Sequence, residues 1–496
     1  MTLEFNLVDD KWIKLIGHEP VSLLQFFDMQ EEEAPKLAGT PVQKLLVFRL
    51  LLAIAQCACP LDDEDDYAEL SVDDLKAGVR DYLKRQRDGF RLFDPERPFL
   101  QHPGVTVRDE KKKLPLSAFL PGACTGNATL LFDGNSLPST LSDSDRVYAL
   151  LSLVTFGMGG KKPDKQLVFS SGLVKKSAPA SPALGRGWLH CIPMGSDVYQ
   201  SLKLNLVTQD MFEQVELSFL SKGVGTPPWE RMPLTEIGPD AADYAHSLVG
   251  WLVPVSRFCR LFDESVYLTS GVAYPAVSTG QCDLTVSTRN TGRDDKNTKI
   301  TAVRARRDVA PWRQLDAVLA FCGDRQTEGC RALKLFRTVR QDDVTAIWCV
   351  GIQVSEQSGE QYMSGRDDFV ESIFRIAPGW QDTVFFKRYC DEMAWIDSIR
   401  KAIYVCVTGY YKELSAAELG PNHAARAEDL FWSQCASVGV KMAEACGVAD
   451  PKAYRPAFKQ AALTAYDAVC PKRNARQLMA YQKCRPVFKR QDEVRK

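Results

Sequence analysis

The sequence has little that would place it in a membrane, in an oxidising compartment or around a structural zinc ion. Its apolar runs stay short of the roughly 20 residues of a membrane helix, because Arg49 and Gln56 interrupt the longest one, residues 45–60. Among 15 cysteines there is no C-x-x-C pair, and the five histidines are scattered, whereas zinc ligands are usually paired at short spacing. The first residues do not combine a basic start with an apolar stretch. We therefore expect a cytoplasmic protein with reduced thiols, no bound metal and no membrane contact.

An excess of positive charge is also missing. The chain has 62 Lys and Arg against 63 Asp and Glu, a net charge of −1. A protein that coats nucleic acid by charge alone is basic overall. Any contact with nucleic acid must therefore come from local patches.

The motifs of common enzyme classes fail as well. Residues 156–166, "FGMGGKKPDKQ", put glycines beside lysines, but a phosphate-binding loop needs Ser or Thr after its lysine, and here Lys162 is followed by Pro163. The same proline blocks the helix that a dinucleotide-binding turn requires. G-x-S-x-G and H-E-x-x-H are absent. We therefore expect a binding protein without catalysis or cofactor. A metal-dependent nuclease built on acidic pairs such as Asp367 and Asp368 stays open as an alternative.

The residue pattern predicts an α+β protein. Thr40, Pro41 and Gln43 are typical of a helix start, and Ser22 of an N-cap. Residues 4–16 and 202–209 resemble strands. After residue 378, four segments with helical spacing and short breaks predict a C-terminal four-helix bundle. We therefore expect a large mixed α/β domain with long loops at residues 1–378, and the bundle at residues 379–496.

Several segments, taken in order, resemble one family, the large subunit of the type I-E CRISPR surveillance complex Cascade (the CasA family). The segments are "FNLVDDKWIKLIGHEPVSLLQFF" from residue 5, "FRLFDPERPFLQ" from residue 90, "GNATLLFDG" from residue 126, "TFGMGGKKPD" from residue 155 and "DVAPWRQLDAVL" from residue 308. Each motif alone is modest, but their order and spacing cover nearly the whole chain.

The resemblance implies a non-catalytic subunit that recognises the protospacer-adjacent motif (PAM) in duplex DNA through the minor groove. Its expected partners are the other Cascade subunits, the crRNA, double-stranded target DNA and the CRISPR helicase-nuclease. Such a subunit helps to start strand separation, while guide pairing supplies the remaining specificity of R-loop formation in antiviral defence. A purely structural scaffold subunit of a ribonucleoprotein is the second alternative.

The resemblance assigns PAM recognition to the glycine loop, residues 157–162. Backbone without side chains can enter the minor groove, which is about 6 Å wide. Neighbouring lysines would contact phosphates, which position a protein without specifying sequence. The residues are Gly157, Gly159, Gly160, Lys161 and Lys162. An ordinary glycine turn with solvated lysines is the alternative.

A second loop is expected near the PAM and the end of the crRNA. Phe132 could stack on a base or lie in the core, and Asn127 could make polar contacts or belong to a turn. The loop comprises Asn127, Phe132, Asp133 and Gly134.

A third element is a short polar hairpin after the apolar strand "TAIWCV". In the family, such a hairpin places a glutamine beneath the PAM, and inserted side chains are a known means of unstacking a base step. Either Gln357 or Gln361 could fill this role, with Ser358 and Gly359 at the turn. The sequence leaves the register open, and a plain exposed hairpin is the alternative.

One departure concerns the lysine that the family can insert into the minor groove. Residues 267–281, where it would lie, contain no lysine. A basic loop downstream, containing Arg289, Arg293, Lys296 and Lys299, could replace it or follow DNA phosphates. The PAM sequence itself is left undetermined.

Overall fold

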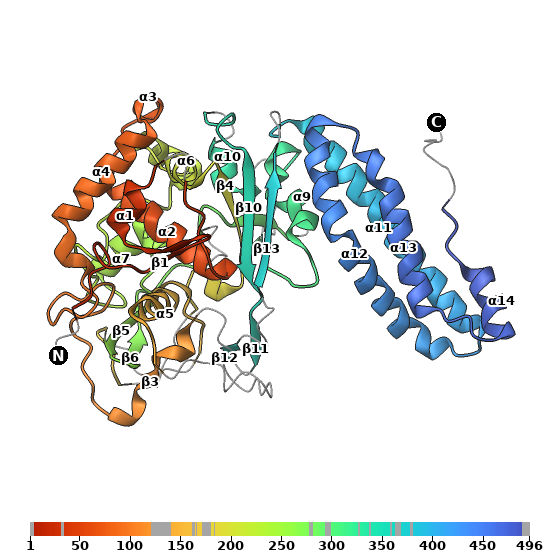
Figure 1. Ribbon diagram of the computed structural model, residues 1–496, viewed down its shortest axis with the longest axis horizontal. Coiled ribbons are helices and arrows are strands. Elements are labelled where there is room, and N and C mark those ends of the chain that lie inside the picture. Colours follow the sequence, from red (N-terminus) through yellow and green to blue (C-terminus); the bar gives the residue numbers. More distant parts are fainter. Residues whose placement is uncertain are drawn as a thin grey trace. The chain divides into compact units, whose positions relative to one another are not determined.

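The chain forms two compact units in the computed structural model (Figure 1). The first holds Met1–Arg307 and Glu328–Ile373, and the second holds Asp308–Thr327 and Phe374–Lys496. Residues 308–327 thus group with the C-terminal helices. The structure describes residues 4–30, 34–120, 140–160, 164, 166–170, 180–182, 184–276, 281–292, 299–325, 328–336, 339–357, 360–362, 369–376 and 380–488.

The first unit contains three small sheets, two two-stranded ribbons and the helices around them. Its sheets have the strand orders β13-β10-β4, β3-β6-β5 and β8-β7-β9, and its ribbons are β1-β2 and β11-β12. The strands are β1 (Ile13–Leu15), β2 (His18–Val21), β3 (Leu114–Pro115), β4 (Leu189–Met194), β5 (Arg257–Phe262), β6 (Ser265–Ser270), β7 (Ser287–Asn290), β8 (Ile300–Ala302), β9 (Gly329–Cys330), β10 (Ala346–Ile352), β11 (Ser355–Gln357), β12 (Glu360–Tyr362) and β13 (Phe369–Arg375). The helices are α1 (Leu23–Asp28), α2 (Pro41–Ala58), α3 (Glu64–Glu69), α4 (Val72–Arg85), α5 (Asp143–Phe156), α6 (Val198–Leu204), α7 (Pro239–Ala245), α8 (Leu248–Leu252) and α10 (Arg331–Phe336).

Helix α2 is the central helix of this unit. The predicted start is confirmed: the Gln43 N–H donates to Thr40 Oγ1, and the Thr40 N–H donates to Gln43 Oε1 at 2.8 Å, with Pro41 at the first position. The helix contacts α4, α5, α6, α8 and β10, and most of its side chains are buried. It is apolar and long enough to pass for a membrane span, yet 72% of it is buried within the protein. Its apolar surface is therefore that of a core helix.

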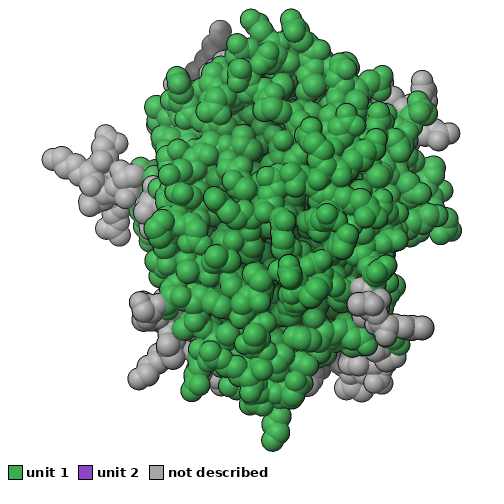
Figure 2. Space-filling model, turned by 90° about the vertical axis from the view of Figure 1, so that its left-hand side faces the viewer, with its two compact units in different colours: residues 1–307, 328–373 green, residues 308–327, 374–496 purple. Residues whose placement is uncertain are grey.

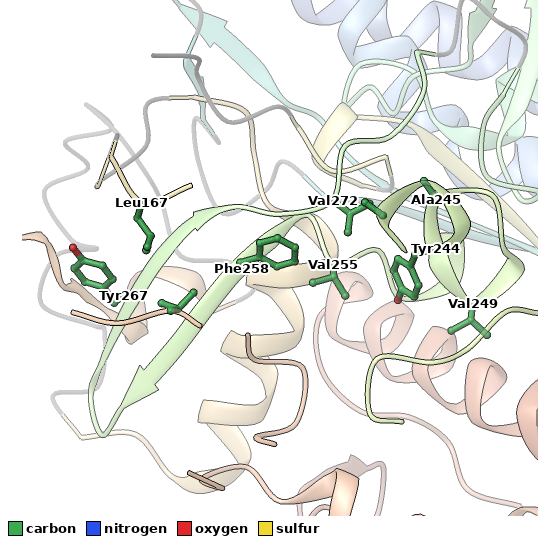
Figure 3. Close-up of a cluster of buried hydrophobic side chains, with 10 residues drawn as sticks. Leu167, Tyr244, Ala245, Val249, Val255, Phe258, Tyr267 and Val272 are labelled. Carbon is green, nitrogen blue, oxygen red and sulfur yellow. The ribbon is translucent and has the colours of Figure 1, made fainter. Parts of the chain in front are cut away.

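A second part of the core lies between the β5–β6 hairpin and helices α7 and α8 (Figure 3). Phe258 and Tyr267 project from the two strands of the hairpin, and Tyr244 and Val249 come from the helices. All four are at most 4% exposed. This packing holds the hairpin rigidly in the core of the first unit. Figure 2 shows that the side chains of the first unit form the face of the protein that is turned to the viewer in that picture.

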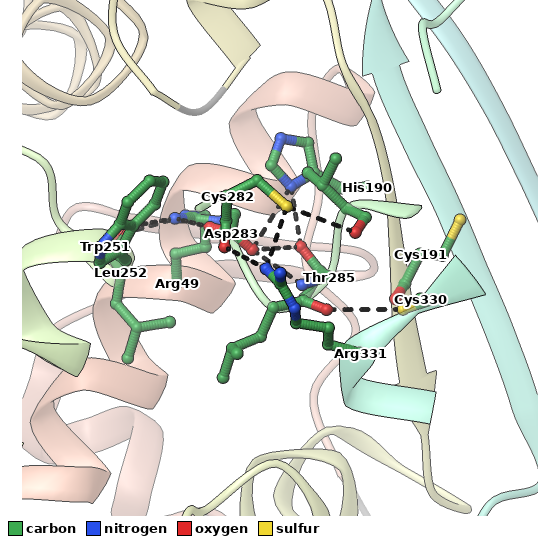
Figure 4. Close-up of polar contacts among 12 residues, drawn as sticks. Arg49, His190, Cys191, Trp251, Leu252, Cys282, Asp283, Thr285, Cys330 and Arg331 are labelled. Carbon is green, nitrogen blue, oxygen red and sulfur yellow. Dashed lines mark hydrogen bonds and ion pairs between the residues drawn. The ribbon is translucent and has the colours of Figure 1, made fainter. Parts of the chain in front are cut away.

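A buried polar network joins α2 to two of the sheets (Figure 4). Arg49 of α2 forms an ion pair with Asp283 at 2.6 Å and donates to the carbonyls of Trp251 and Leu252 at the end of α8. Burial alone would raise the pKa of Asp283, but the charge of Arg49, with hydrogen bonds from Arg49 and Thr285, outweighs it and lowers the pKa to about 2. Asp283 is thus a buried carboxylate that stays ionised.

His190 of β4 completes this network in its neutral form. The Thr285 hydroxyl donates to Asp283, so Thr285 Oγ1 accepts from His190 Nδ1–H at 2.8 Å. Complete burial lowers the pKa of His190 to about 4, because it and the charge of Arg49 outweigh the opposing charge of Asp283. Among the described residues, His190 Nε2 has no partner.

The second unit is helical. Helices α11 (Thr383–Glu413) and α12 (Gly420–Val448) pack along each other, α13 (Arg455–Val469) contacts both, and α14 (Ala475–Cys484) contacts α11. The short helix α9 (Leu315–Val318) belongs to the same unit. The Tyr389 hydroxyl of α11 donates to the carbonyl of buried Trp312 at 2.7 Å and so fixes the segment before α9 to the bundle. The predicted α+β class with C-terminal helices is confirmed.

Two local predictions are wrong. In residues 4–16 only Ile13–Leu15 forms a strand, because Asn6 Oδ1 accepts from the Val8 N–H and bends the chain first. Residues 202–209 do not form a strand, because Asp197 caps the N–H groups of Tyr199 and Gln200 and starts helix α6.

Removing the cation of the buried pair should destabilise the first unit strongly. Arg49→Met leaves an ionised, buried Asp283 without its partner, and we expect a loss of about 3–5 kcal/mol in unfolding free energy. The control is Lys44→Met, which breaks a partly exposed pair with Glu371 and should cost roughly 1 kcal/mol or less. Urea denaturation of the purified chain measures both. Equal losses would contradict the central role of Arg49.

Acidification should also act through His190. Its pKa is about 4 in the folded protein and 6.5 ordinarily, so between these pH values only the unfolded chain takes up the proton. The unfolding free energy should therefore fall as the pH drops from 6.5 towards 4, by up to roughly 3 kcal/mol from this residue. His190→Gln should lack that part of the pH dependence in parallel urea titrations, and an unchanged slope would contradict this assignment.

Candidate nucleic-acid interface

The described part of the glycine loop, Gly157–Gly160, begins where α5 ends. A continuing helix would give the Val154 carbonyl to the N–H of Met158. Instead, Ser256 takes that carbonyl with its N–H at 2.9 Å and with its hydroxyl at 2.8 Å. Gly157 then leaves the helical conformation, with φ −48° and ψ 121°. The segment that leads into β5 therefore ends the helix and starts the loop.

The carbonyl groups of the loop accept hydrogen bonds from three other segments. One donor is the backbone at residue 181, one is the first side chain of β5, and one is the backbone of β12. Gly157 accepts from the Ser181 N–H at 2.8 Å, Met158 from the Arg257 guanidinium, and Gly159 from the Gln361 N–H at 3.0 Å. The acceptor side of the loop is thus turned towards the protein. Among the described residues, the N–H groups of Met158 and Gly160 have no hydrogen-bond partner.

Arg257 lies beneath the loop. It is 4% exposed and also donates to the Ser256 carbonyl at 2.6 Å. Burial lowers its pKa to about 10, so the guanidinium keeps its charge at neutral pH. It therefore places a positive charge directly under backbone that is itself only half-buried.

Asp164 anchors the chain a few residues after the glycines. Its carboxylate accepts from the Tyr267 hydroxyl of β6 at 2.7 Å, from the Gln166 N–H at 2.9 Å and from Lys112 Nζ at 3.2 Å. Burial pushes its pKa up, but these contacts outweigh it and lower the pKa. Both ends of the segment are therefore attached to the β5–β6 hairpin.

The hairpin that the sequence predicted forms as β11 and β12 and reaches the loop through Gln361. The Gly159 N–H donates to Gln361 Oε1 at 2.7 Å, in addition to the backbone bond between the same two residues. The register pairs Gln361 with Glu356 and Gln357 with Glu360. The two glutamines therefore belong to successive cross-strand pairs of the hairpin, one on each strand. The structure thus brings Gln361 to the glycine loop.

The remaining predicted residues lie apart from this contact or outside the described residues. Arg289 of β7 pairs with Thr301 of β8, and exposed Lys299 precedes β8. Neither forms a hydrogen bond or ion pair with Gly157–Gly160 among the described residues. Outside the described residues lie Lys161, Lys162, Asn127, Phe132, Asp133, Gly134, Arg293, Lys296, Ser358, Gly359 and the acidic pair Asp367 and Asp368.

Sequence reasoning missed Ser181, Ser256 and Arg257, which shape the loop. Nothing local marks them, because their partners lie 24 to 102 positions away. In the part of the chain that the structure describes, no group of three His, Cys, Asp or Glu side chains could hold a metal ion.

A side chain at residue 157 should disturb this arrangement. A Cβ there would lie 2.9 Å from the Leu153 carbonyl oxygen and 3.1 Å from Arg257 Cγ, so we expect Gly157→Ala to lose about 1–3 kcal/mol of unfolding free energy. Gly409→Ala in α11 is the control, because its nearest neighbours lie at 3.5 Å or beyond and helix propensity favours alanine. Denaturant melts of both variants test the tight fit, and a fully stable Gly157→Ala protein would refute it.

Comparison with known proteins places the chain in one family. The family model described as CRISPR-associated protein Cse1 matches residues 6–470. The CRISPR-associated protein CasA/Cse1 of Thermus thermophilus is 29% identical over 345 residues, which cover 65% of this chain and 61% of that relative. The chain thus spans less than two thirds of the length of this curated relative.

Solved structures agree in fold. The crystal structure of Cse1 from Acidimicrobium ferrooxidans superposes with a TM-score of 0.73 at 16% identity, covering 97% of this chain and 96% of that one. A chain of a CRISPR RNA-guided surveillance complex gives a TM-score of 0.69 at 17% identity, covering 97% and 99%. Because the family model spans almost the whole sequence, the chain belongs to the CRISPR-associated Cse1 family.

Proposed function

We propose that this chain is the non-catalytic large subunit of a type I-E, crRNA-guided surveillance complex, and that its glycine loop recognises the PAM in duplex DNA. The loop approaches the minor groove with its backbone. The observation that carries the proposal is the orientation of that backbone, whose carbonyls are held by donors within the protein.

This orientation changes the electrostatics of a helix C-terminus. Such an end carries about half a negative charge on its free carbonyls and repels phosphates. Here the carbonyls of Val154 and Thr155 accept from Ser256 and Ser181. The carbonyls of Gly157, Met158 and Gly159 are occupied as well, that of Met158 by the Arg257 cation. The end of α5 is therefore compatible with a polyanion, although its dipole alone would oppose one.

The exposed hydrogen-bonding groups of the loop fit the partner. The minor-groove edge of A·T pairs presents acceptors only, and DNA phosphates are acceptors as well. A backbone that offers N–H groups at Met158 and Gly160, above a buried cation, complements both. Gly160, at φ +156°, also has a conformation that other residues rarely adopt.

The comparisons support the wider assignment. A CRISPR RNA-guided surveillance complex of known structure contains a chain with the same fold along its whole length. By family membership we extend to this protein a cytoplasmic location, assembly with the other Cascade subunits and crRNA, and docking of the helicase-nuclease. We also propose that the subunit helps to start strand separation.

A charge placed on the loop tests the proposal. Gly160→Asp and Gly160→Asn share the same size and backbone strain, so their difference isolates the charge. In the assembled crRNA-guided complex, binding to target DNA flanked by a randomised PAM library should show a preferred motif for the unmodified protein. The Asp variant should bind at least about 10-fold more weakly than the Asn variant at low salt, and the difference should shrink as salt rises.

Other outcomes separate the alternatives. Absence of any preferred motif, or equal binding by both variants, would leave a structural scaffold as the better description. Cleavage of DNA by the purified chain in a titration with Mg²⁺ or Mn²⁺ would instead favour a nuclease.

A further inference from the structure

The contact between Gln361 and Gly159 has two parts that differ in kind. The Gly159 carbonyl accepts from the backbone N–H of β12 at 3.0 Å, whereas its N–H donates to the side-chain oxygen of Gln361 at 2.7 Å. The first bond is fixed by the position of the strand. The second depends on a side chain that can rotate without any movement of the backbone.

The same division holds across Gly157–Gly159, the part of the loop whose carbonyl bonds are described. Its carbonyls are bound by backbone N–H groups or by the buried guanidinium of Arg257. The N–H of Gly159 is bound by a partly exposed side chain. The carbonyls of Gly157, Met158 and Gly159 are therefore bound by fixed groups of the protein. The Gly159 N–H, in contrast, is covered by a side-chain oxygen that can rotate away.

The Gln361 side-chain oxygen, which covers this donor, resembles the acceptor atoms of nucleic acid that the loop would meet. A carboxamide oxygen is an uncharged sp² acceptor, as is the O2 of a pyrimidine in the minor groove. The N3 of a purine and a phosphate oxygen accept from the same kind of donor. Exchanging one such acceptor for another keeps the Gly159 N–H satisfied at every stage except the exchange itself, so the penalty for a bare buried donor is avoided.

We propose that Gln361 is a positioning residue that occupies the Gly159 amide in the absence of target, and that an acceptor on the bound DNA displaces it. This inference rests on the proposed function, since it assumes that DNA reaches the glycine loop. It assigns to Gln361 a role in the unbound protein, and it makes uncovering of Gly159 a part of target engagement.

The experiment follows hydrogen exchange of the Gly159 amide in the assembled complex, by mass spectrometry with fragmentation that resolves single residues. Gln361→Leu removes the acceptor at similar size, Gln361→Glu keeps an acceptor, and Gln357→Leu changes the other glutamine of the same hairpin. Without DNA, exchange at Gly159 should be slow in the unmodified, Gln361→Glu and Gln357→Leu proteins, and at least about 10-fold faster in Gln361→Leu, the change expected for losing roughly one hydrogen bond.

Addition of duplex target DNA should restore slow exchange in Gln361→Leu, because the DNA acceptor takes the vacant donor. Two modified duplexes identify this acceptor. Replacing the flanking purines by 3-deazapurines removes N3 and should abolish the restored protection if a purine edge binds. Methylphosphonates at the flanking positions should abolish it if a phosphate binds. Protection that survives both replacements identifies a pyrimidine O2.

Two results would overturn the inference. One is slow exchange at Gly159 in Gln361→Leu without DNA. The other is fast exchange that persists in Gln361→Leu when a binding assay shows saturation with DNA. Failure of the unmodified complex to bind target DNA at all appears in that binding assay and would overturn the proposed function itself, whatever the exchange rates without DNA.

Discussion

The buried ion pair between Arg49 and Asp283 is the constraint on which the first unit depends. Two charges in the interior are stable only when their geometry and hydrogen bonds are complete. Arg49 uses its guanidinium for Asp283 and for the two carbonyls that end α8. The central helix is thereby fixed in position relative to both α8 and the turn before β7.

The residues that Arg49 holds in place lie close in sequence to those that shape the glycine loop. Only three residues separate Leu252, held by Arg49, from Ser256, which ends α5. Arg257 follows and supports the loop from below. The β5–β6 hairpin that continues from it packs into the apolar cluster and also holds Asp164 through Tyr267. The loop is short and glycine-rich, yet its conformation is fixed by its contacts with Ser256, Arg257 and the β5–β6 hairpin.

The sequence succeeded wherever the information is local. The capping box of α2, the helical C-terminal third and the polar hairpin after β10 all follow from residues a few positions apart. The residue pattern failed at residues 4–16 and 202–209, where Asn6 and Asp197 compete for backbone N–H groups and override apolar alternation. Gly157, Gly159 and Gly160 could be singled out as a loop, but their relation to Gln361, 202 positions from Gly159, could not.

The sequence by itself determined the α+β class, the glycine-rich backbone at residues 157–160 and, through ordered motifs, the family. Those features depend on local propensity and on side-chain identity. The tertiary structure alone decided which way that backbone faces and which glutamine meets it. These depend on donors from residue 181, β5 and β12 converging on consecutive carbonyls, and such convergence arises only when distant segments pack around one core.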